Sequence, residues 1–262
     1  MSLLSVPSLT PTTWQYRTPI TVYSASTTTA DVEVSIPDDW DLFWSNVRTS
    51  GEDIRVTTSN GTTLATFGLS SFNKTNRTGT IQIDAASLQT GANCFWLYWG
   101  HASAATAATS PTISAPVTGY IELSTPAGPR VLRAGQQQPR TTSSTLAPIS
   151  KAKADKVYVY VVPDDLNERA DPHGQVTVLD ELGYVTYEYL RDGTTAEASM
   201  VDATATRFVS QGTATEQPSA VMVLFQGSHV SSTEGILSIT YTTARGARRN
   251  VRGYCLVTDY GI

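Results

Sequence analysis

The chain has 262 residues, 40% of them hydrophobic and only 16% charged, and its formal net charge is −5. This composition argues against disorder of the whole chain, and the acidic balance gives no reason to expect nucleic acid as a partner. The sequence contains no run of about 18 apolar residues, so no membrane span is predicted. Residues 1–7 lack the basic and apolar regions of a signal peptide, and we therefore expect the chain to fold in a cytoplasm.

Residues 1–12 are predicted to form an extended N-terminal arm. Pro7 and Pro11 exclude a helix and weaken strand pairing. The apolar side chains of Leu3, Leu4 and Val6 do not follow a helical spacing, and they are candidate partner-binding residues. Two interpretations stay open: the segment is a frayed tail, or it is an arm that docks on a neighbouring molecule.

Residues 13–102 are predicted to form a β-sandwich domain. Short β-prone runs alternate here with turn residues, and Asn60-Gly61 between two such runs is the strongest hairpin signal. Residues 39–44 can form a single helical turn that places Trp40 and Trp44 on one side. Short strands separated by regular turns are typical of sandwiches and jelly rolls. The strands are predicted at residues 15–23, 31–36, 54–58, 63–69, 79–84 and 94–99.

The predicted strand at residues 94–99 is apolar on both faces. Alternation places Trp96 and Tyr98 on the face opposite Phe95, Leu97 and Trp99. If Trp96 and Tyr98 were bare, they would expose on the order of 300–500 Å² of surface, a size that usually marks an interaction site. We therefore expect this face to be covered by an edge arm, by the other half of the chain, by a ligand or by another subunit. Both residues are candidate partner-binding residues.

Four segments of this region carry a resemblance to a known family. They are residues 14–22 (Trp-Gln-Tyr-Arg-Thr-Pro-Ile-Thr-Val), 51–57 (Gly-Glu-Asp-Ile-Arg-Val-Thr), 60–64 (Asn-Gly-Thr-Thr-Leu) and 95–104 (Phe-Trp-Leu-Tyr-Trp-Gly-His-Ala-Ser-Ala). In order and spacing they resemble a prokaryotic and viral β-sandwich domain family of unknown function, which looks related to laminin-G or concanavalin-like modules. The resemblance implies a domain of a surface-exposed protein, and it carries over no catalytic residue. The family's Tyr-Tyr-Gly ending is Tyr98-Trp99-Gly100 here, which implies different surface contacts.

Residues 103–155 are predicted to be a linker, because most of the segment is of low complexity or too polar to form a core. Within it, residues 117–134 can form a β-hairpin. Residues 156–262 are predicted to form a second β-sandwich domain. Its strands are expected at residues 157–162, 175–179, 183–190, 206–210, 220–225, 236–243 and 253–258. The predicted fold class is therefore all-β, with two β-sandwich, jelly-roll-like domains joined by extended linkers.

The sequence contains none of the catalytic or metal-binding motifs that we sought. It lacks the nucleophile elbow, the phosphate loop, His-Glu-x-x-His, Cys-x-x-Cys and the EF-hand calcium loop. The acidic segment 164–173 is interpreted either as a calcium loop or as a solvated loop. Cys94 and Cys255 are expected to be buried thiols, with a disulfide or a reactive thiol as the alternatives. We predict no catalytic residue, no cofactor and no metal.

A cluster of arginines near the C-terminus supplies further candidate partner-binding residues. Guanidinium groups bind carboxylates through two parallel hydrogen bonds. Two interpretations stay open: the cluster is part of a solvated hairpin, or it docks on an acidic patch of a partner subunit. The four residues are Arg245, Arg248, Arg249 and Arg252.

These features predict a non-enzymatic virion structural protein of a tailed bacteriophage, either a head decoration or cement protein or a component of the tail or its adaptor. Expected partners are other virion proteins and further copies of the chain in a homo-oligomer, and the expected location is the virion, assembled in the host cytoplasm. The alternative is a carbohydrate-binding module that recognises a host surface glycan, with Trp40 and Trp44 stacked on sugar rings. A hydrolase would require an acid–base pair in a pocket.

Overall fold

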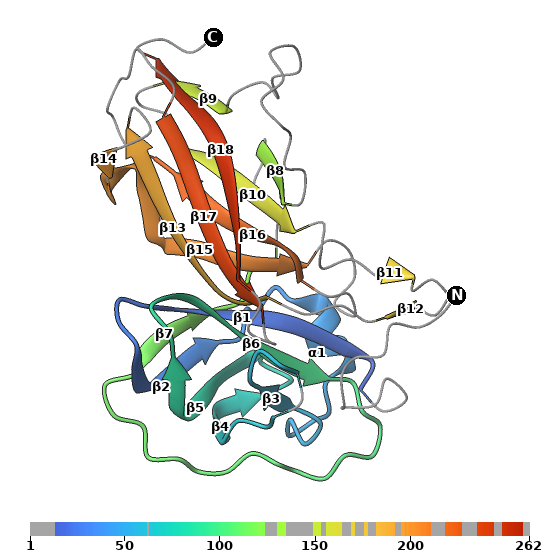
Figure 1. The fold of residues 1–262 in the computed structure, drawn as a ribbon. Helices are drawn as coiled ribbons and strands as arrows, with labels where there is room; N and C mark the ends of the chain where they lie inside the picture. The colour runs from blue at the N-terminus through green and yellow to red at the C-terminus, as the bar shows by residue number, and fades with distance from the viewer. Residues whose placement is uncertain are drawn as a thin grey trace.

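The structure is a computed structural model (Figure 1). Within the residues it describes, the chain is all-β, as predicted, with α1 (Asp41–Asn46) as the one α-helix and η2 (Ala198–Met200) as a 3-10 turn. In this described part, neither helix is long and apolar enough to cross a membrane. The described residues are 14–61, 63–123, 130–134, 149–152, 156–163, 169–170, 176–177, 182–191, 195–196, 198–210, 218–226, 235–243 and 248–258.

The first half, residues 14–123, contains the helix and seven strands. Hydrogen bonding places the strands in the order β4-β5-β2-β7-β1-β6, and β3 also pairs with β6. The predicted strand 63–69 begins only at Phe67. Ahead of it the Thr58 N–H donates to the Thr63 carbonyl at 2.9 Å, and Gly61 has φ +68°. The strands are β1 (Tyr16–Ser24), β2 (Thr28–Ser35), β3 (Arg55–Thr57), β4 (Phe67–Asn73), β5 (Thr78–Leu88), β6 (Gly91–Trp99) and β7 (Val117–Tyr120).

The second half, the described residues from 130 onward, contains the remaining strands. One group continues the large sheet in the order β13-β17-β18-β9, a second sheet has the order β15-β16-β10-β8, and β11 pairs with β12. The strands are β8 (Arg130–Ala134), β9 (Ile149–Ala152), β10 (Val157–Pro163), β11 (Arg169–Ala170), β12 (Val176–Thr177), β13 (Leu182–Arg191), β14 (Thr195–Ala196), β15 (Val201–Ser210), β16 (Pro218–Phe225), β17 (Gly235–Thr243) and β18 (Arg248–Thr258).

The two halves share one sheet. β13 pairs with β6 in antiparallel register, with Tyr184 opposite Asn93 and Val185 opposite Ala92. The 12-stranded sheet therefore continues from the first half through β6 and β13 into the second half, and Figure 1 shows β1 and β6 at the junction of the two halves. Gly91 begins β6 at φ +110°, and a Cβ there would collide with the Val185 carbonyl oxygen. A glycine at this position therefore lets β6 and β13 approach each other.

β6 contributes to both hydrophobic cores, because alternate side chains point to opposite faces of a strand. Phe95, Leu97 and Trp99 lie in the core of the first half. Trp96 and Tyr98, on the other face, pack in a second core with residues of β10, β13, β15, β16 and β17. The prediction that both faces of this strand are covered is confirmed, and the cover of the second face is the other half of the chain.

The predicted hairpin at residues 117–134 does not form, although strands occur at both of its ends. β7 lies between β1 and β2 in the large sheet, whereas β8 pairs in parallel with β10 in the second sheet. An isolated two-stranded hairpin is marginally stable in water, and an existing sheet supplies a short strand with more main-chain partners.

Candidate functional site

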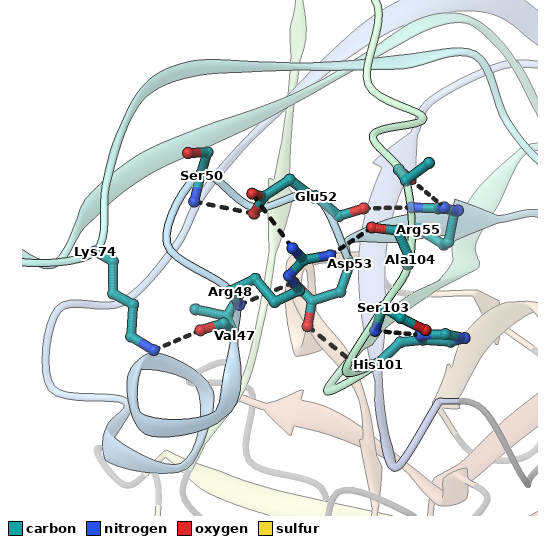
Figure 2. Close-up of polar contacts among 11 residues, drawn as sticks. Val47, Arg48, Ser50, Glu52, Asp53, Arg55, Lys74, His101, Ser103 and Ala104 are labelled. Atoms are coloured by element: carbon teal, nitrogen blue, oxygen red, sulfur yellow. Dashed lines mark hydrogen bonds and ion pairs between the residues drawn. The ribbon is translucent and has the colours of Figure 1, made fainter.

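A cluster of charged and polar side chains lies where the turn after α1 meets the chain that leaves β6 (Figure 2). We call Arg48, Glu52, Asp53, Arg55 and His101 the Asp53 cluster. The turn that carries most of them includes Gly51, which has φ +72°, a conformation that favours glycine. Two segments distant in sequence are brought together at this cluster.

Asp53 is fully buried, and its carboxylate is satisfied by main-chain donors. Oδ1 accepts the Arg48 N–H at 2.9 Å, and Oδ2 accepts the N–H groups of Gly100 and His101 at 2.8 and 3.2 Å. The Asp53 carbonyl accepts the indole N–H of Trp14 at 2.8 Å. A buried carboxylate is costly unless it is hydrogen-bonded, so these bonds explain how Asp53 is tolerated inside the fold. Asp53 thereby joins the turn after α1 to the end of β6.

The two arginines of the cluster bind main-chain carbonyls of the segment that follows. Arg48 Nη1 donates to the Ala104 carbonyl and Arg55 Nη2 to the Ala105 carbonyl, both at 2.6 Å. Arg55 is 8% exposed, and its desolvation lowers the pKa of the guanidinium while the charge of Asp53 opposes that shift. Arg48 also lies 3.8 Å from Glu52, a partly exposed pair of small energetic value. The arginines therefore fasten the chain after β6 to the body of the first half.

His101 completes the cluster through its ring. The ring lies 4.5 Å from the Trp14 ring, and its Nδ1 accepts the Ser103 N–H at 3.1 Å, so a neutral imidazole here carries its proton on Nε2. The Arg55 guanidinium lies 5.1 Å from the centre of the Trp14 ring. Both Asp53 oxygens and His101 Nδ1 thus accept main-chain donors, and these bonds support the fold.

Within the described residues, no group of three or more His, Cys, Asp and Glu side chains could hold a metal ion. Most of the acidic segment 164–173 lies outside the described residues, where both of its interpretations remain predictions. Cys94 is buried against the second half, and the side chain of Cys255 is outside the description.

Trp96 and Tyr98, expected at a partner surface, are 0% and 1% exposed inside the chain. The Arg17 guanidinium lies 3.9 Å from the centre of the Trp96 ring, and Arg17 Nη1 donates to the Tyr98 hydroxyl at 3.4 Å. The Tyr98 hydroxyl in turn donates to the Gly61 carbonyl at 3.4 Å. The aromatic pair is therefore covered internally, and it gives no argument for a partner protein.

Trp40 and Trp44, expected to stack on sugar rings, lie in the core of the first half. They are 7% and 2% exposed. Trp40 stacks on Phe43 at 4.9 Å and meets the Trp99 ring edge-on at 4.8 Å, and the Trp44 indole donates to the Pro37 carbonyl at 2.7 Å. The helical turn predicted at residues 39–44 is observed as α1, but it turns both indoles inward. Neither ring presents a face to a glycan.

For the other predicted partner-binding residues, the structure describes either the main chain alone or nothing. Leu3, Leu4, Val6 and Arg245 are not among the described residues. Arg248, Arg249 and Arg252 lie on β18, which pairs with β17, but their side chains are not described. Their proposed contacts remain predictions.

Two contacts between the halves were missed by the sequence reasoning. Arg207 on β15 places its guanidinium 3.7 Å from the centre of the Tyr120 ring, and its desolvation lowers the pKa of that guanidinium. Phe208 donates its main-chain N–H to Thr21 Oγ1 at 2.8 Å. No local sequence pattern predicts such pairs, because the two partners are far apart in the sequence. For Asp53 and Arg55 the sequence did contain a signal, since both lie in residues 51–57, one of the four segments that carry the family resemblance.

The fold and the cluster together define an all-β protein whose described buried charges serve its architecture. No protein-family model and no curated protein matches the chain. The resemblance of residues 14–104 to a β-sandwich family of unknown function therefore rests on its sequence landmarks alone.

Proposed function

We propose that the chain is a non-enzymatic structural protein of the virion of a tailed bacteriophage, acting through contacts between subunits as head decoration or cement, or as a component of the tail or its adaptor. The observation that carries the proposal is the use of Asp53, Arg48 and Arg55, which bind main-chain groups of the segment after β6 and fasten it to a continuous 12-stranded sheet. A particle subunit needs a defined shape, because symmetry brings the same surface patches together in every copy. Weak contacts repeated in this way add up through multivalency.

Sequence features supply the rest of the support. The landmark segments resemble a prokaryotic and viral family found in surface-exposed proteins. The apolar arm with Leu3, Leu4 and Val6, and the arginines around Arg248 and Arg249, are the candidate contacts with other virion proteins and with copies of the chain. The proposed location is the virion, assembled in the host cytoplasm.

A glycan-binding function has no specific observation in its favour. The indoles of Trp40 and Trp44 are occupied by the core, so a sugar would have to be recognised by other residues. We therefore carry the assembly proposal forward alone.

Light scattering of the purified full chain over a wide concentration range, combined with negative-stain electron microscopy, tests the proposal. We expect closed assemblies that grow in population with concentration. Replacing Arg248 and Arg249 together by Glu should weaken them, whereas Lys156→Glu, which reverses an exposed charge elsewhere, should not. A chain that stays monomeric at every concentration would contradict the proposal.

A further inference from the structure

β1 and β2 follow each other in the chain but are not neighbours in the sheet. Residues 25–27 connect them, yet β7 lies between them. β7 runs antiparallel to β1, with Gly119 opposite Val22, and parallel to β2, with Gly119 also aligned with Val34. The first half is therefore completed by a strand that arrives after β6. We call the space between β1 and β2 the β7 slot.

The β7 slot holds its strand mainly through the main chain. On β7 the side chains of Thr118 and Tyr120 are exposed, and only Gly119 is buried. A Cβ on Gly119 would lie 2.6 Å from Val34 Cγ2 and 3.3 Å from Ile20 Cγ2, so any larger residue at the centre of the slot would force these side chains to shift. Main-chain pairing combined with a pocket for one residue type is how sheets recognise an added strand.

The segment that delivers β7 is long and is fastened to the first half at separate points. We call residues 101–116 the strap; in Figure 1 it runs from the end of β6 along the lower edge of the first half to β7. Most of its residues are exposed. Beyond the two arginine contacts and the His101 N–H on Asp53 Oδ2 at 3.2 Å, its described main-chain anchors are the Thr109 N–H on the Phe67 carbonyl at 2.7 Å and the Ser114 N–H on Asp31 Oδ2 at 2.7 Å. The Thr109 hydroxyl donates to the same Phe67 carbonyl at 3.0 Å.

The strap is also long enough to reach a neighbouring molecule. Residues 106–116 alone span at most roughly 35–40 Å when extended. That length exceeds the radius of gyration of a domain of about 100 residues, roughly 13 Å. Once the Thr109 and Ser114 anchors, the pairing of β7 with β1 and β2 and the contacts of the second half with β6 are released together, the strap is long enough to carry β7 and the chain that follows it to a neighbouring copy.

We propose that the strap is a hinge for exchange between copies, so that β7 and the second half of one copy occupy the β7 slot and the β6 face of another. This inference rests on the proposed function, because it names how subunits join. An exchanged pair makes the same contacts as a closed copy: β7 with β1 and β2, β13 with β6, and Phe208 with Thr21. The balance between the two forms then depends on concentration and on the strap, which is how domain swapping makes dimers at low cost.

The register of β7 supplies a test. Glu33 on β2 and Thr118 on β7 are aligned neighbours, and both are at least partly exposed. One full-length chain carries Glu33→Cys, the other Thr118→Cys, and the two are unfolded together in urea, refolded at high concentration and oxidised with oxidised glutathione. We expect the yield of disulfide-linked heterodimer to be several-fold higher than that of a control pair, Ser87→Cys with Thr118→Cys. Ser87 lies on β5 opposite Thr29, away from the slot.

A second variant blocks the exchange. A chain with both Glu33→Cys and Thr118→Cys, oxidised while dilute, is locked closed, because adjacent strands bring Cα atoms within disulfide range. We expect the locked chain to stay monomeric after refolding, and the same protein to form oligomers once its disulfide is reduced. The wild-type chain is oxidised and reduced in the same way, as a control for Cys94 and Cys255. Assemblies built equally well by the locked chain would overturn the exchange and leave the proposed function standing. A monomer under every condition, in wild type as well, would overturn both.

Discussion

Phe208 on β15 donates its main-chain N–H to Thr21 Oγ1 on β1 at 2.8 Å, and both residues are buried. The two residues are 187 positions apart in the sequence. The bond joins the second sheet to the first half at a place where the two do not pair as strands. It therefore adds a buried polar contact to an interface that also contains the pairing of β6 with β13, the Arg207–Tyr120 contact and the apolar core around β6.

Replacing Thr21 by Val should destabilise the chain by about 1–3 kcal/mol, because the buried Phe208 N–H would lose its acceptor. Thr21→Ser is the matched control, since it keeps the hydroxyl and removes only a methyl, worth about 0.8 kcal/mol. Urea unfolding followed by tryptophan fluorescence measures both. A valine variant as stable as wild type would show that the bond does not contribute.

Trp96→Ala should lower the stability of both halves together. The indole packs in the core that β6 shares with the second half, and truncating a buried aromatic costs about 3–5 kcal/mol. Because one sheet runs through both halves, we expect a single unfolding transition in wild type and in the variant, shifted to lower temperature. Scanning calorimetry and circular dichroism should give coincident curves. Two separated transitions, with only one shifted, would indicate that the halves unfold independently.

How far the sequence predicted this fold depends on which feature is considered. The apolar run at residues 94–99 predicted a strand covered on both faces, because half-buried strands typically alternate apolar with polar residues and this one does not. The turn at Asn60-Gly61 and the helical turn near Trp40 were also predicted, since both rest on local chemistry. Trp40 and Trp44 were correctly placed on one side of that turn, but whether that side faces the core or the solvent depends on contacts with distant strands.

The slot for β7 lay beyond sequence reasoning for a physical reason. Val117–Tyr120 is a short strand with little burial, so its pattern does not specify a partner. Its place is fixed by the gap between β1 and β2 and by the close packing at Gly119, which only the assembled sheet defines. The strap was likewise predicted to belong to a low-complexity linker, because several of its contacts are made by main-chain atoms, which leave no side-chain signature.

Asp53→Asn should cost at least about 2 kcal/mol, because hydrogen bonds to a charged group are each worth about 1.5–3 kcal/mol and the amide would turn a donor toward donors. Three main-chain N–H groups now share the two carboxylate oxygens. Asp41→Asn provides the matched control, since its carboxylate is 80% exposed and pairs with Arg77 on the surface. Urea unfolding of the two variants should separate them clearly; equal effects would assign no special role to Asp53.

Gly119→Val should weaken the insertion of β7. The new side chain would meet Val34 and Ile20 at distances that require these buried residues to shift, and overpacking of this kind costs about 1–3 kcal/mol. Thr118→Val keeps a branched side chain on the exposed neighbour and replaces only its hydroxyl by a methyl, so it serves as the control. Hydrogen exchange at the β7 amides reports the insertion directly. Unchanged protection in the glycine variant would show that the slot has more room than the packing indicates.

Acid should release the strap at Asp31. Two main-chain donors, the N–H groups of Ala85 and Ser114, lower the pKa of the Asp31 carboxyl below its ordinary value. A group whose pKa is lowered by folding stabilises the fold above its unfolded pKa, about 3.9, and that contribution is lost as the pH falls through the folded pKa. The protection of the Ser114 amide against hydrogen exchange should therefore decrease at pH values below about 4.

The Thr109 amide supplies the internal control for this prediction, because it is bonded to the Phe67 carbonyl and no carboxylate takes part. Its protection, corrected for intrinsic exchange, should change little over the same range. In Asp31→Asn the Ser114 amide should lose its pH dependence, since the amide side chain does not titrate there. If Ser114 and Thr109 lost protection in parallel as the pH falls, the cause would be general acid unfolding, and Asp31 would have no separate part in holding the strap.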